Sequence, residues 1–220
     1  MTTTMTRETT TGAIEAAGVV AVIRLNDPTR LRAVVDAIGA GGVRALEVTM
    51  TVPGAVRLIA ELAPVIPADF LLGAGTVTDA DTAVRVMEAG ARFVVGPVFR
   101  RDVIAACHAR GVPVMPGCFS PTEILDAWEA GADIVKVFPA TVLGPSYFKD
   151  LRGPLPHVKL MPTGGVTLDN AGDWIRAGAV AVGVGTALLD AKAIASGNYD
   201  VLRANAERIV ANVAAARKGA

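Results

Sequence analysis

The sequence predicts a closed (β/α)₈ barrel, in which eight parallel strands alternate with helices. Two observations support this prediction. Eight short apolar runs recur about every 23 residues along the 220-residue chain, a spacing that is too wide for β-hairpins but accommodates a strand, a helix and two short loops. Hydrophobic residues make up 52% of the chain and aromatic residues only 5%, and such an aliphatic composition is typical of strands buried on both faces.

The apolar runs are the predicted strands. In chain order they are residues 19–24, 43–49, 70–74, 93–96, 112–116, 133–138, 158–162 and 180–184. The same units would also build an open doubly wound sheet, which is the alternative fold. No linker or low-complexity stretch divides the chain, so residues 1–220 are expected to form a single domain in which residues 1–11 are flexible.

The segments between the strands carry helix signals. Asp27 and Pro28 are typical of a cap followed by the first helical residue, and residues 120–123 have the spacing of a capping box. Acids are favourable in first helical turns, and those expected there are Asp79, Asp102 and Asp169. We predict that residues 11–18 form a leading helix that caps the bottom of the barrel, and that residues 199–217 form a terminal helix.

The charge balance limits the classes of partner. Lys plus Arg and Asp plus Glu both number 21, so the chain lacks the basic excess on which binding to nucleic acid or to an anionic membrane depends. No apolar run approaches the roughly 20 residues that span a bilayer. Cys107 and Cys118 are the only cysteines, so we expect neither a disulfide framework nor a structural zinc site. A soluble, cytoplasmic protein is expected.

Two charged residues fall in strands that a barrel would bury on both faces. Side chains alternate along a strand, so Leu46 and Val48 suit the helix layer and Glu47 is expected in the barrel interior. The same alternation places Lys136 in the interior, on the face that it shares with Ile134. A buried charge is costly unless it has a partner or a role. The alternative is a structural Lys–Glu ion pair, which would contribute little to stability.

Lys136 and Glu47 together indicate covalent catalysis. Burial disfavours an ammonium relative to a neutral amine, and a neutral lysine is a nucleophile for a carbonyl carbon, as Schiff-base chemistry requires. Glu47 would transfer protons to and from the reacting centre. In contrast, Lys159 lies near the start of its strand, where its side chain can reach water. We expect no metal site.

Two glycine-containing loops follow the seventh and eighth predicted strands, at residues 162–166 and 183–186. Glycines at these strand ends let backbone N–H groups approach an anion, and barrels often bind phosphate there. The alternative is a pair of tight turns in which glycine supplies a positive φ.

Five segments of the sequence, LEVTMTVPGA, GAGTVTDADTA, VMPGCFSPTE, VKVFPA and PTGGVTLDN, resemble in order the bacterial 2-keto-3-deoxy-6-phosphogluconate / 4-hydroxy-2-oxoglutarate aldolases. The resemblance extends from about residue 20 to residue 189. It implies a homotrimeric class I aldolase without metal or other cofactor, which acts through a covalent imine on Lys136. Its substrate would be a phosphorylated keto acid, cleaved to pyruvate and glyceraldehyde 3-phosphate as in the Entner–Doudoroff pathway. A second substrate would be 4-hydroxy-2-oxoglutarate, cleaved to pyruvate and glyoxylate.

The resemblance also implies roles for individual residues. Lys136 matches the Schiff-base lysine of the family and Glu47 its general acid/base. The residues that match the pocket around the pyruvyl group are Thr76, Pro97 and Phe138. The residues that match the loops holding the distal phosphate are Thr163, Gly164, Gly165, Gly185 and Thr186.

One position departs from the family pattern. Many members have an arginine four residues after the catalytic glutamate, where it binds the substrate carboxylate, and this chain has Thr51 there. Arg24 ends the first predicted strand at the rim where barrel active sites lie. We therefore predict that the Arg24 guanidinium binds the substrate carboxylate in place of the arginine that is absent at position 51. The alternative is a rim residue paired with Asp27.

The sequence leaves three other functions open. The first stays within the aldolases, with a 6-phosphogalactonate analogue or an unphosphorylated 4-hydroxy-2-oxo acid as substrate. The second is a phosphate-binding barrel isomerase or epimerase, in which Glu47 is the base and Lys136 only an electrophile. The third is a non-catalytic phosphosugar-binding module, because a fold alone does not determine function.

Overall fold

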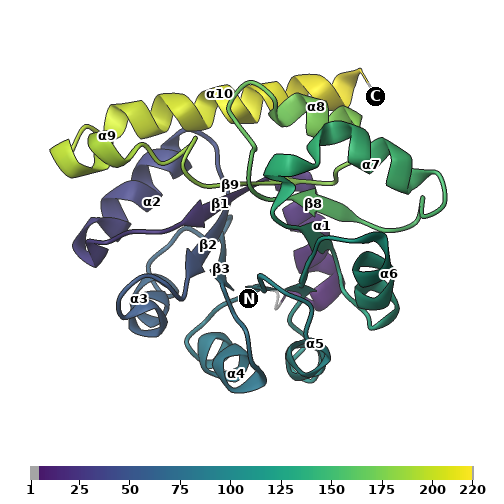
Figure 1. Cartoon of the computed structure of the whole chain (residues 1–220). Helices are drawn as coiled ribbons and strands as arrows, with labels where there is room; N and C mark the ends of the chain where they lie inside the picture. Colours follow the sequence, from purple (N-terminus) through teal and green to yellow (C-terminus); the bar gives the residue numbers. More distant parts are fainter. Residues whose placement is uncertain (1–4, 220) are drawn as a thin grey trace.

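The structure, a computed structural model, describes residues 5–219. Strands lie at the centre and helices surround them (Figure 1). A six-stranded parallel sheet has the order β5-β4-β3-β2-β1-β9, and a three-stranded parallel sheet has the order β6-β7-β8. The predicted alternation of parallel strands and helices is thus confirmed. The strands pair as two sheets, however, and not as the single ring of eight that the sequence predicts.

The strands are short and buried along their whole length. Their bounds are β1 (Val19–Ile23), β2 (Ala45–Thr49), β3 (Leu71–Gly75), β4 (Val94–Val95), β5 (Val114–Met115), β6 (Gly117–Cys118), β7 (Val135–Val137), β8 (Leu160–Pro162) and β9 (Val182–Val184). The fifth predicted run, residues 112–116, contains β5, and a further strand that the sequence does not predict, β6, follows it directly. Pro116 separates β5 from β6, and since proline has no N–H to donate it interrupts the ladder where the chain passes from one sheet to the other.

The helices lie between the strands and after the last one. Their bounds are α1 (Arg7–Ala17), η1 (Pro28–Arg30), α2 (Leu31–Ala40), α3 (Ala55–Leu62), α4 (Ala80–Glu88), α5 (Arg101–His108), α6 (Pro121–Glu129), η2 (Ala140–Val142), α7 (Gly144–Arg152), α8 (Ala171–Arg176), α9 (Ala191–Ser196) and α10 (Tyr199–Lys218). The short helix α9 is absent from the sequence prediction. The terminal helix α10 is confirmed, and it packs along α2 and α8 (Figure 1).

Most of the predicted helix signals act as caps. Asp27 caps η1, and its side chain accepts a hydrogen bond from the Thr29 N–H. The capping box between Ser120 and Glu123 is complete at the start of α6. The prediction for Asp169 is wrong, because α8 begins only at Ala171 and Asp169 instead pairs with an arginine of α10.

Helix α1 begins earlier than the sequence predicts. The Thr6 hydroxyl accepts a hydrogen bond from the Thr9 N–H and so starts the helix at Arg7. Thr10 and Thr11 are buried. Residues 7–11, which are expected from the sequence to be flexible, thus lie in helix α1, and residues 1–4 lie outside the described part of the chain.

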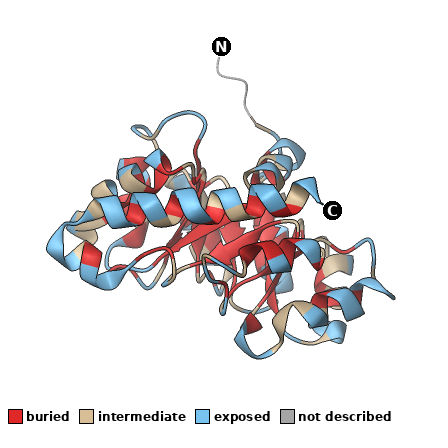
Figure 2. Cartoon of the chain, turned by 90° about the horizontal axis from the view of Figure 1, so that it is seen from above, coloured by how far each residue is buried: buried red, intermediate tan, exposed pale blue. Residues whose placement is uncertain are grey.

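The buried apolar residues form two clusters, one on each face of the strands. The inner cluster consists of Ile14, Val20, Ala45, Leu71, Phe93, Val95, Met115, Ile134, Met161 and Ala181. The outer cluster joins the strands to the helices and includes Leu46, Val48, Val135 and Val137. Figure 2 shows buried residues along the strands and on the inward faces of the helices. The predicted alternation in β2 and β7 is therefore confirmed, and Ile14 places α1 against the barrel interior.

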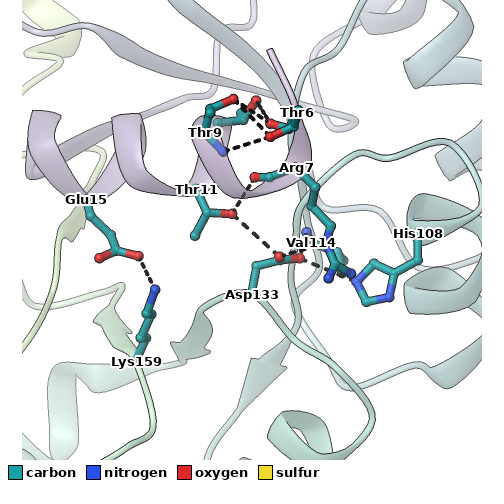
Figure 3. A network of polar contacts seen from close by, with 10 residues as sticks. Thr6, Arg7, Thr9, Thr11, Glu15, His108, Val114, Asp133 and Lys159 are labelled. Atoms are coloured by element: carbon teal, nitrogen blue, oxygen red, sulfur yellow. Dashed lines mark hydrogen bonds and ion pairs between the residues drawn. The ribbon is translucent and has the colours of Figure 1, made fainter.

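A polar network ties α1 to the strands (Figure 3). Asp133 accepts a hydrogen bond of 2.9 Å from the Val114 N–H and lies 3.4 Å from the Arg7 guanidinium. Lys159 donates to a Glu15 carboxylate oxygen of α1 at 2.6 Å, and its side chain is 42% exposed. Lys159 is thus a partly exposed structural residue, as the sequence predicts.

The two sheets approach each other along both of their edges. Thr163 and Gly183 form an isolated parallel bridge between the β8 and β9 segments. On the other side, the Asp133 N–H donates to the Val114 carbonyl at 3.1 Å. Among residues 5–219, no helix combines the length and the hydropathy needed to cross a membrane.

Candidate active site

Glu47 and Lys136 are the only charged residues of the described chain in the buried class, with exposed fractions of 0% and 2%. They come from β2 in the six-stranded sheet and from β7 in the three-stranded sheet. Their strand neighbours Ala45 and Ile134 belong to the inner cluster. Both charged side chains therefore point into the barrel interior, as the alternation predicts.

The Glu47 carboxyl is buried without a hydrogen-bond partner. Within residues 5–219, neither of its oxygens accepts a hydrogen bond and no ion pair joins it to Lys136. Burial raises the pKa of Glu47 above its ordinary value, and the positive charges of Lys136 and Arg24 partly oppose this shift. The structural ion pair that the sequence leaves open is therefore not formed. An unpaired buried carboxyl with a raised pKa is typical of a functional site.

Lys136 lies beneath an aromatic ring that reaches the protein surface. Its Nζ lies 5.2 Å from the centroid of the Phe138 ring. The backbone on both sides of Lys136 is fixed, because β7 pairs with Gly117 of β6 and with Met161 of β8. A rigid strand on each side holds the amine in one position, as covalent chemistry at a single carbonyl carbon requires.

A pocket of about 180 Å³ opens at the carboxyl ends of β1, β7, β8 and β9. It is lined by Val22, Arg24, Phe138, Thr163, Gly164, Gly165, Val166, Gly183, Gly185, Thr186 and Leu189. Seven of the predicted site residues thus share one pocket. Val22, Val166, Gly183 and Leu189 are additions to the predicted site residues. Val166 and Gly183 lie within the two predicted glycine loops, and Val22 alternates onto the same face as Arg24.

The two glycine loops differ in why they contain glycine. Gly164 and Gly165 have φ values of 87° and 75°, and a side chain on Gly165 would come 2.8 Å from the Thr141 Cα. The tight-turn explanation therefore applies to both. Gly185 does not have a positive φ, and a side chain there would meet only Val22, at 3.5 Å and 3.9 Å. The absence of a side chain at position 185 therefore leaves space on the pocket wall.

The Thr163 hydroxyl is buried at the pocket without a hydrogen-bond partner among the described residues. Thr163 is only 6% exposed and lines the pocket. Its Oγ1 has no hydrogen-bond partner among the residues that the structure describes. A buried hydroxyl without a partner is costly, so an acceptor or donor from a bound molecule would satisfy it.

Arg24 follows β1 and lies exposed on the pocket wall. The predicted alternative, a pair with Asp27, is not formed, because Asp27 accepts hydrogen bonds from Thr29 and lies 3.4 Å from Arg30. Thr51 does not line this pocket, and its hydroxyl lies 2.7 Å from that of Thr49. The structure thus leaves Arg24 on the pocket wall without an ion pair among the described residues and commits the Thr51 hydroxyl to a local contact.

Thr76 and Pro97 do not line the pocket but follow the adjacent strands β3 and β4. Thr76 has a φ of 60° and is the only non-glycine residue with a positive φ within residues 5–219. This conformation is strained for a β-branched side chain, and such strain is concentrated at functional sites. Pro97 is partly exposed, and its backbone carbonyl occupies the space next to Gly117 of β6.

The two cysteines belong to the outer cluster and not to the barrel interior. Cys107 and Cys118 are free and buried, and burial raises the pKa of each thiol to about 12. Such thiols are unreactive. Within the described residues, no three His, Cys, Asp or Glu side chains are grouped as metal ligands would be.

Comparison with known proteins identifies the family. Residues 11–205 match the family model for KDPG and KHG aldolase. The chain belongs to this family. It is therefore an aldolase, an enzyme of the carbon–carbon lyase class.

Individual relatives of this aldolase cover most of both chains. The 2-dehydro-3-deoxy-phosphogluconate aldolase of Treponema pallidum is 37% identical over 193 residues, which are 87% of this chain and 91% of that protein. A probable 2-dehydro-3-deoxy-6-phosphogalactonate aldolase of Rhizobium meliloti is 36% identical over 170 residues, 77% of this chain and 80% of that protein. A crystal structure of KDPG aldolase from Legionella pneumophila, with pyruvate captured as a covalent carbinolamine intermediate, has a TM-score of 0.84 and 29% identity. That match covers 91% of this chain and 97% of the other.

Proposed function

We propose that this aldolase cleaves 2-keto-3-deoxy-6-phosphogluconate to pyruvate and glyceraldehyde 3-phosphate through a covalent imine on Lys136, without a metal or other cofactor. The observation that carries the proposal is the pair of buried residues Lys136 and Glu47 in the barrel interior, beneath a pocket with two glycine loops. The relative with a covalent pyruvate carbinolamine supports the same chemistry. We also propose cleavage of 4-hydroxy-2-oxoglutarate to pyruvate and glyoxylate.

The proposed reaction uses Lys136 as nucleophile and electron sink. Its ammonium gives up a proton, the free amine adds to the C2 carbonyl carbon, and loss of water gives an iminium. The iminium accepts the electron pair of the C3–C4 bond as this bond breaks, while Glu47 takes the proton of the C4 hydroxyl. The aldehyde then leaves, and Glu47 returns a proton to C3 of the enamine. Water hydrolyses the resulting iminium, which releases pyruvate and restores the amine.

The raised pKa of Glu47 suits this double role. A carboxylate with an ordinary pKa is a weak base, so it would accept the proton of the C4 hydroxyl poorly. Because burial moves the pKa of Glu47 upward, the same group can accept a proton from one atom and deliver it to another.

The second candidate substrate is the 6-phosphogalactonate analogue, because a relative from Rhizobium meliloti at 36% identity carries that name. The two substrates differ in the configuration of one hydroxyl. A pyruvate-coupled assay on both epimers tests the proposal, and we expect the higher kcat/KM with the gluconate compound. A higher kcat/KM with the galactonate compound would mean that this compound, and not 2-keto-3-deoxy-6-phosphogluconate, is the preferred substrate. Absence of pyruvate from both epimers and from 4-hydroxy-2-oxoglutarate would contradict the proposed function itself.

We propose that the two glycine loops bind the distal phosphate. The candidate residues are Thr163, Gly164, Gly165, Gly185 and Thr186, which all line the pocket. The unpartnered Thr163 hydroxyl supports this role, as does the space that the glycines leave for backbone N–H groups to approach an anion.

Gly185→Asp should raise KM for the phosphorylated substrate by roughly tenfold or more, because it places a negative charge beside the phosphate. KM for 4-hydroxy-2-oxoglutarate should change far less. Gly185→Ala is the matched control, since its methyl group would meet only Val22 at ordinary contact distances. Steady-state kinetics on both substrates measure the effect, and equal changes for the two substrates would mean that Gly185 serves folding and not anion binding.

We propose that Arg24 binds the substrate carboxylate in place of the arginine absent at Thr51. Arg24 lines the pocket, has no ion pair within residues 5–219, and its charge partly opposes the rise that burial causes in the pKa of Glu47. We assign the remaining pyruvyl contacts to Thr76, Pro97 and Phe138.

Arg24→Ala should weaken pyruvate and substrate binding alike, by about tenfold, a modest effect because the guanidinium is exposed and screened by water. Adding Thr51→Arg should restore part of this loss, whereas Thr51→Arg in the otherwise unchanged protein should help little. The measurement is the pyruvate concentration needed for half-maximal borohydride trapping. If Arg24→Ala leaves it unchanged, other groups such as Thr76 hold the carboxylate.

We propose that the two sheets close into one eight-stranded barrel and that the protein is a cytoplasmic homotrimer. The bridge between Thr163 and Gly183 supports closure. Three exposed apolar side chains beyond the carboxyl ends of the strands, those of Val98, Phe119 and Val142, support self-association. Light scattering tests the assembly, and a monomer mass of 22.6 kDa would contradict it.

A further inference from the structure

The Glu47 carboxylate occupies space that exists only because residue 75 is glycine. A Cβ placed on Gly75 would overlap the Glu47 Oε1 and Cδ atoms and fall 2.5 Å from its Cγ. The three protein atoms nearest to that position all belong to Glu47. No residue with a side chain can therefore stand at position 75 while Glu47 keeps its present position.

The backbone at this position does not itself require glycine. Gly75 is the last residue of β3, and its φ lies outside the left-handed region. Glycine weakens a strand, because it adds backbone entropy to the unfolded chain and contributes no side chain to packing. The close approach of Glu47 is the feature that accounts for it.

A second glycine of β3 shows why the carboxylate lies where it does. In the register of the sheet, Glu47 is opposite Gly73, and Thr49 is opposite Gly75. The space over Gly73 is filled by the ring of Phe93, which is fully buried. The Glu47 side chain therefore leans along the strand toward Gly75, away from the floor of the barrel and toward its carboxyl-terminal rim.

We propose that Gly75 is a positioning residue for proton transfer. Because it has no side chain, the Glu47 carboxylate can lie beside it, near the carboxyl-terminal ends of the strands in the barrel interior. The Phe93 ring fills the space over Gly73, and the Glu47 carboxylate fills the space over Gly75. The proposal rests on the proposed catalytic role of Glu47. It assigns to β3 a function in the reaction, although β3 contributes no side chain to the chemistry.

Gly75→Ala should lower kcat for cleavage by about a hundredfold, because displacement of a catalytic group by about 1 Å costs this much. Borohydride trapping of pyruvate on Lys136 should persist and KM should change much less, since the added methyl group displaces the carboxylate and not the amine. A near-normal kcat would overturn the inference. If instead Glu47→Gln cleaves normally, the proposed role of Glu47 is what fails.

Stability of paired variants tests the contact itself. Gly75→Ala should lower Tm clearly in the otherwise unchanged protein but little in a Glu47→Ala background, where the overlapping atoms are absent. Gly73→Ala is the matched control on the same strand, and it should lower Tm equally in both backgrounds, because its methyl group meets Phe93. An equal loss for Gly75→Ala in both backgrounds, or failure of the Gly75→Ala, Glu47→Ala double variant to fold, would overturn the inference.

Discussion

Lys136→Arg should lose essentially all turnover, although it keeps a positive charge in the barrel. A guanidinium stays protonated at any pH at which the protein is folded, so no free amine remains to form an imine. In the unchanged protein, pyruvate and borohydride together should add one reduced pyruvate to Lys136 and abolish activity. Peptide mapping by mass spectrometry identifies the labelled residue.

Lys159→Arg is the matched control for this experiment. Lys159 is the other lysine that the sequence places in a predicted strand, but its amine is bound to Glu15 of α1 at the opposite end of the barrel. The variant should keep its activity and its borohydride label. Labelling of Lys159 would move the imine to that residue, whereas labelling of no lysine would contradict an imine mechanism and would favour the isomerase alternative.

Glu47→Gln should lower the rate of C–C cleavage by roughly 10²–10⁴-fold, the usual range for a general acid or base. The imine on Lys136 should still form and be trapped, at least slowly, because the amide removes the proton-transfer group but leaves the nucleophile. Single-turnover cleavage and borohydride trapping measure the two steps separately. Near-normal cleavage would mean that a water molecule or another residue transfers the protons.

The pH dependence of the free energy of unfolding shows whether the Glu47→Gln variant is folded. The pKa of Glu47 is raised in the folded protein, so its ionised form opposes folding above that pKa and this cost disappears below the ordinary pKa of a glutamate. Replacement by glutamine removes the cost. We therefore expect Glu47→Gln to gain stability relative to the unchanged protein as pH rises through this window, which urea unfolding at several pH values measures.

Several parts of the site could be predicted from the sequence because they depend on local geometry. The period of two along a strand places Glu47 and Lys136 on the inner face without knowledge of any distant residue. Partners in space were harder to predict. Asp27 binds Thr29 and Arg30, and the sequence does not show which of the nearby arginines, Arg24 or Arg30, it would bind.

The sequence by itself determined the alternation of strands and helices, most helix caps and the burial of two charged residues, because each follows from the spacing of residues close along the chain. Only the tertiary structure decided that the strands pair as two sheets and that Gly75 makes room for Glu47. These features join residues far apart in the chain, and they depend on the register and packing between elements. One sequence does not specify that register, because each strand alone is compatible with several.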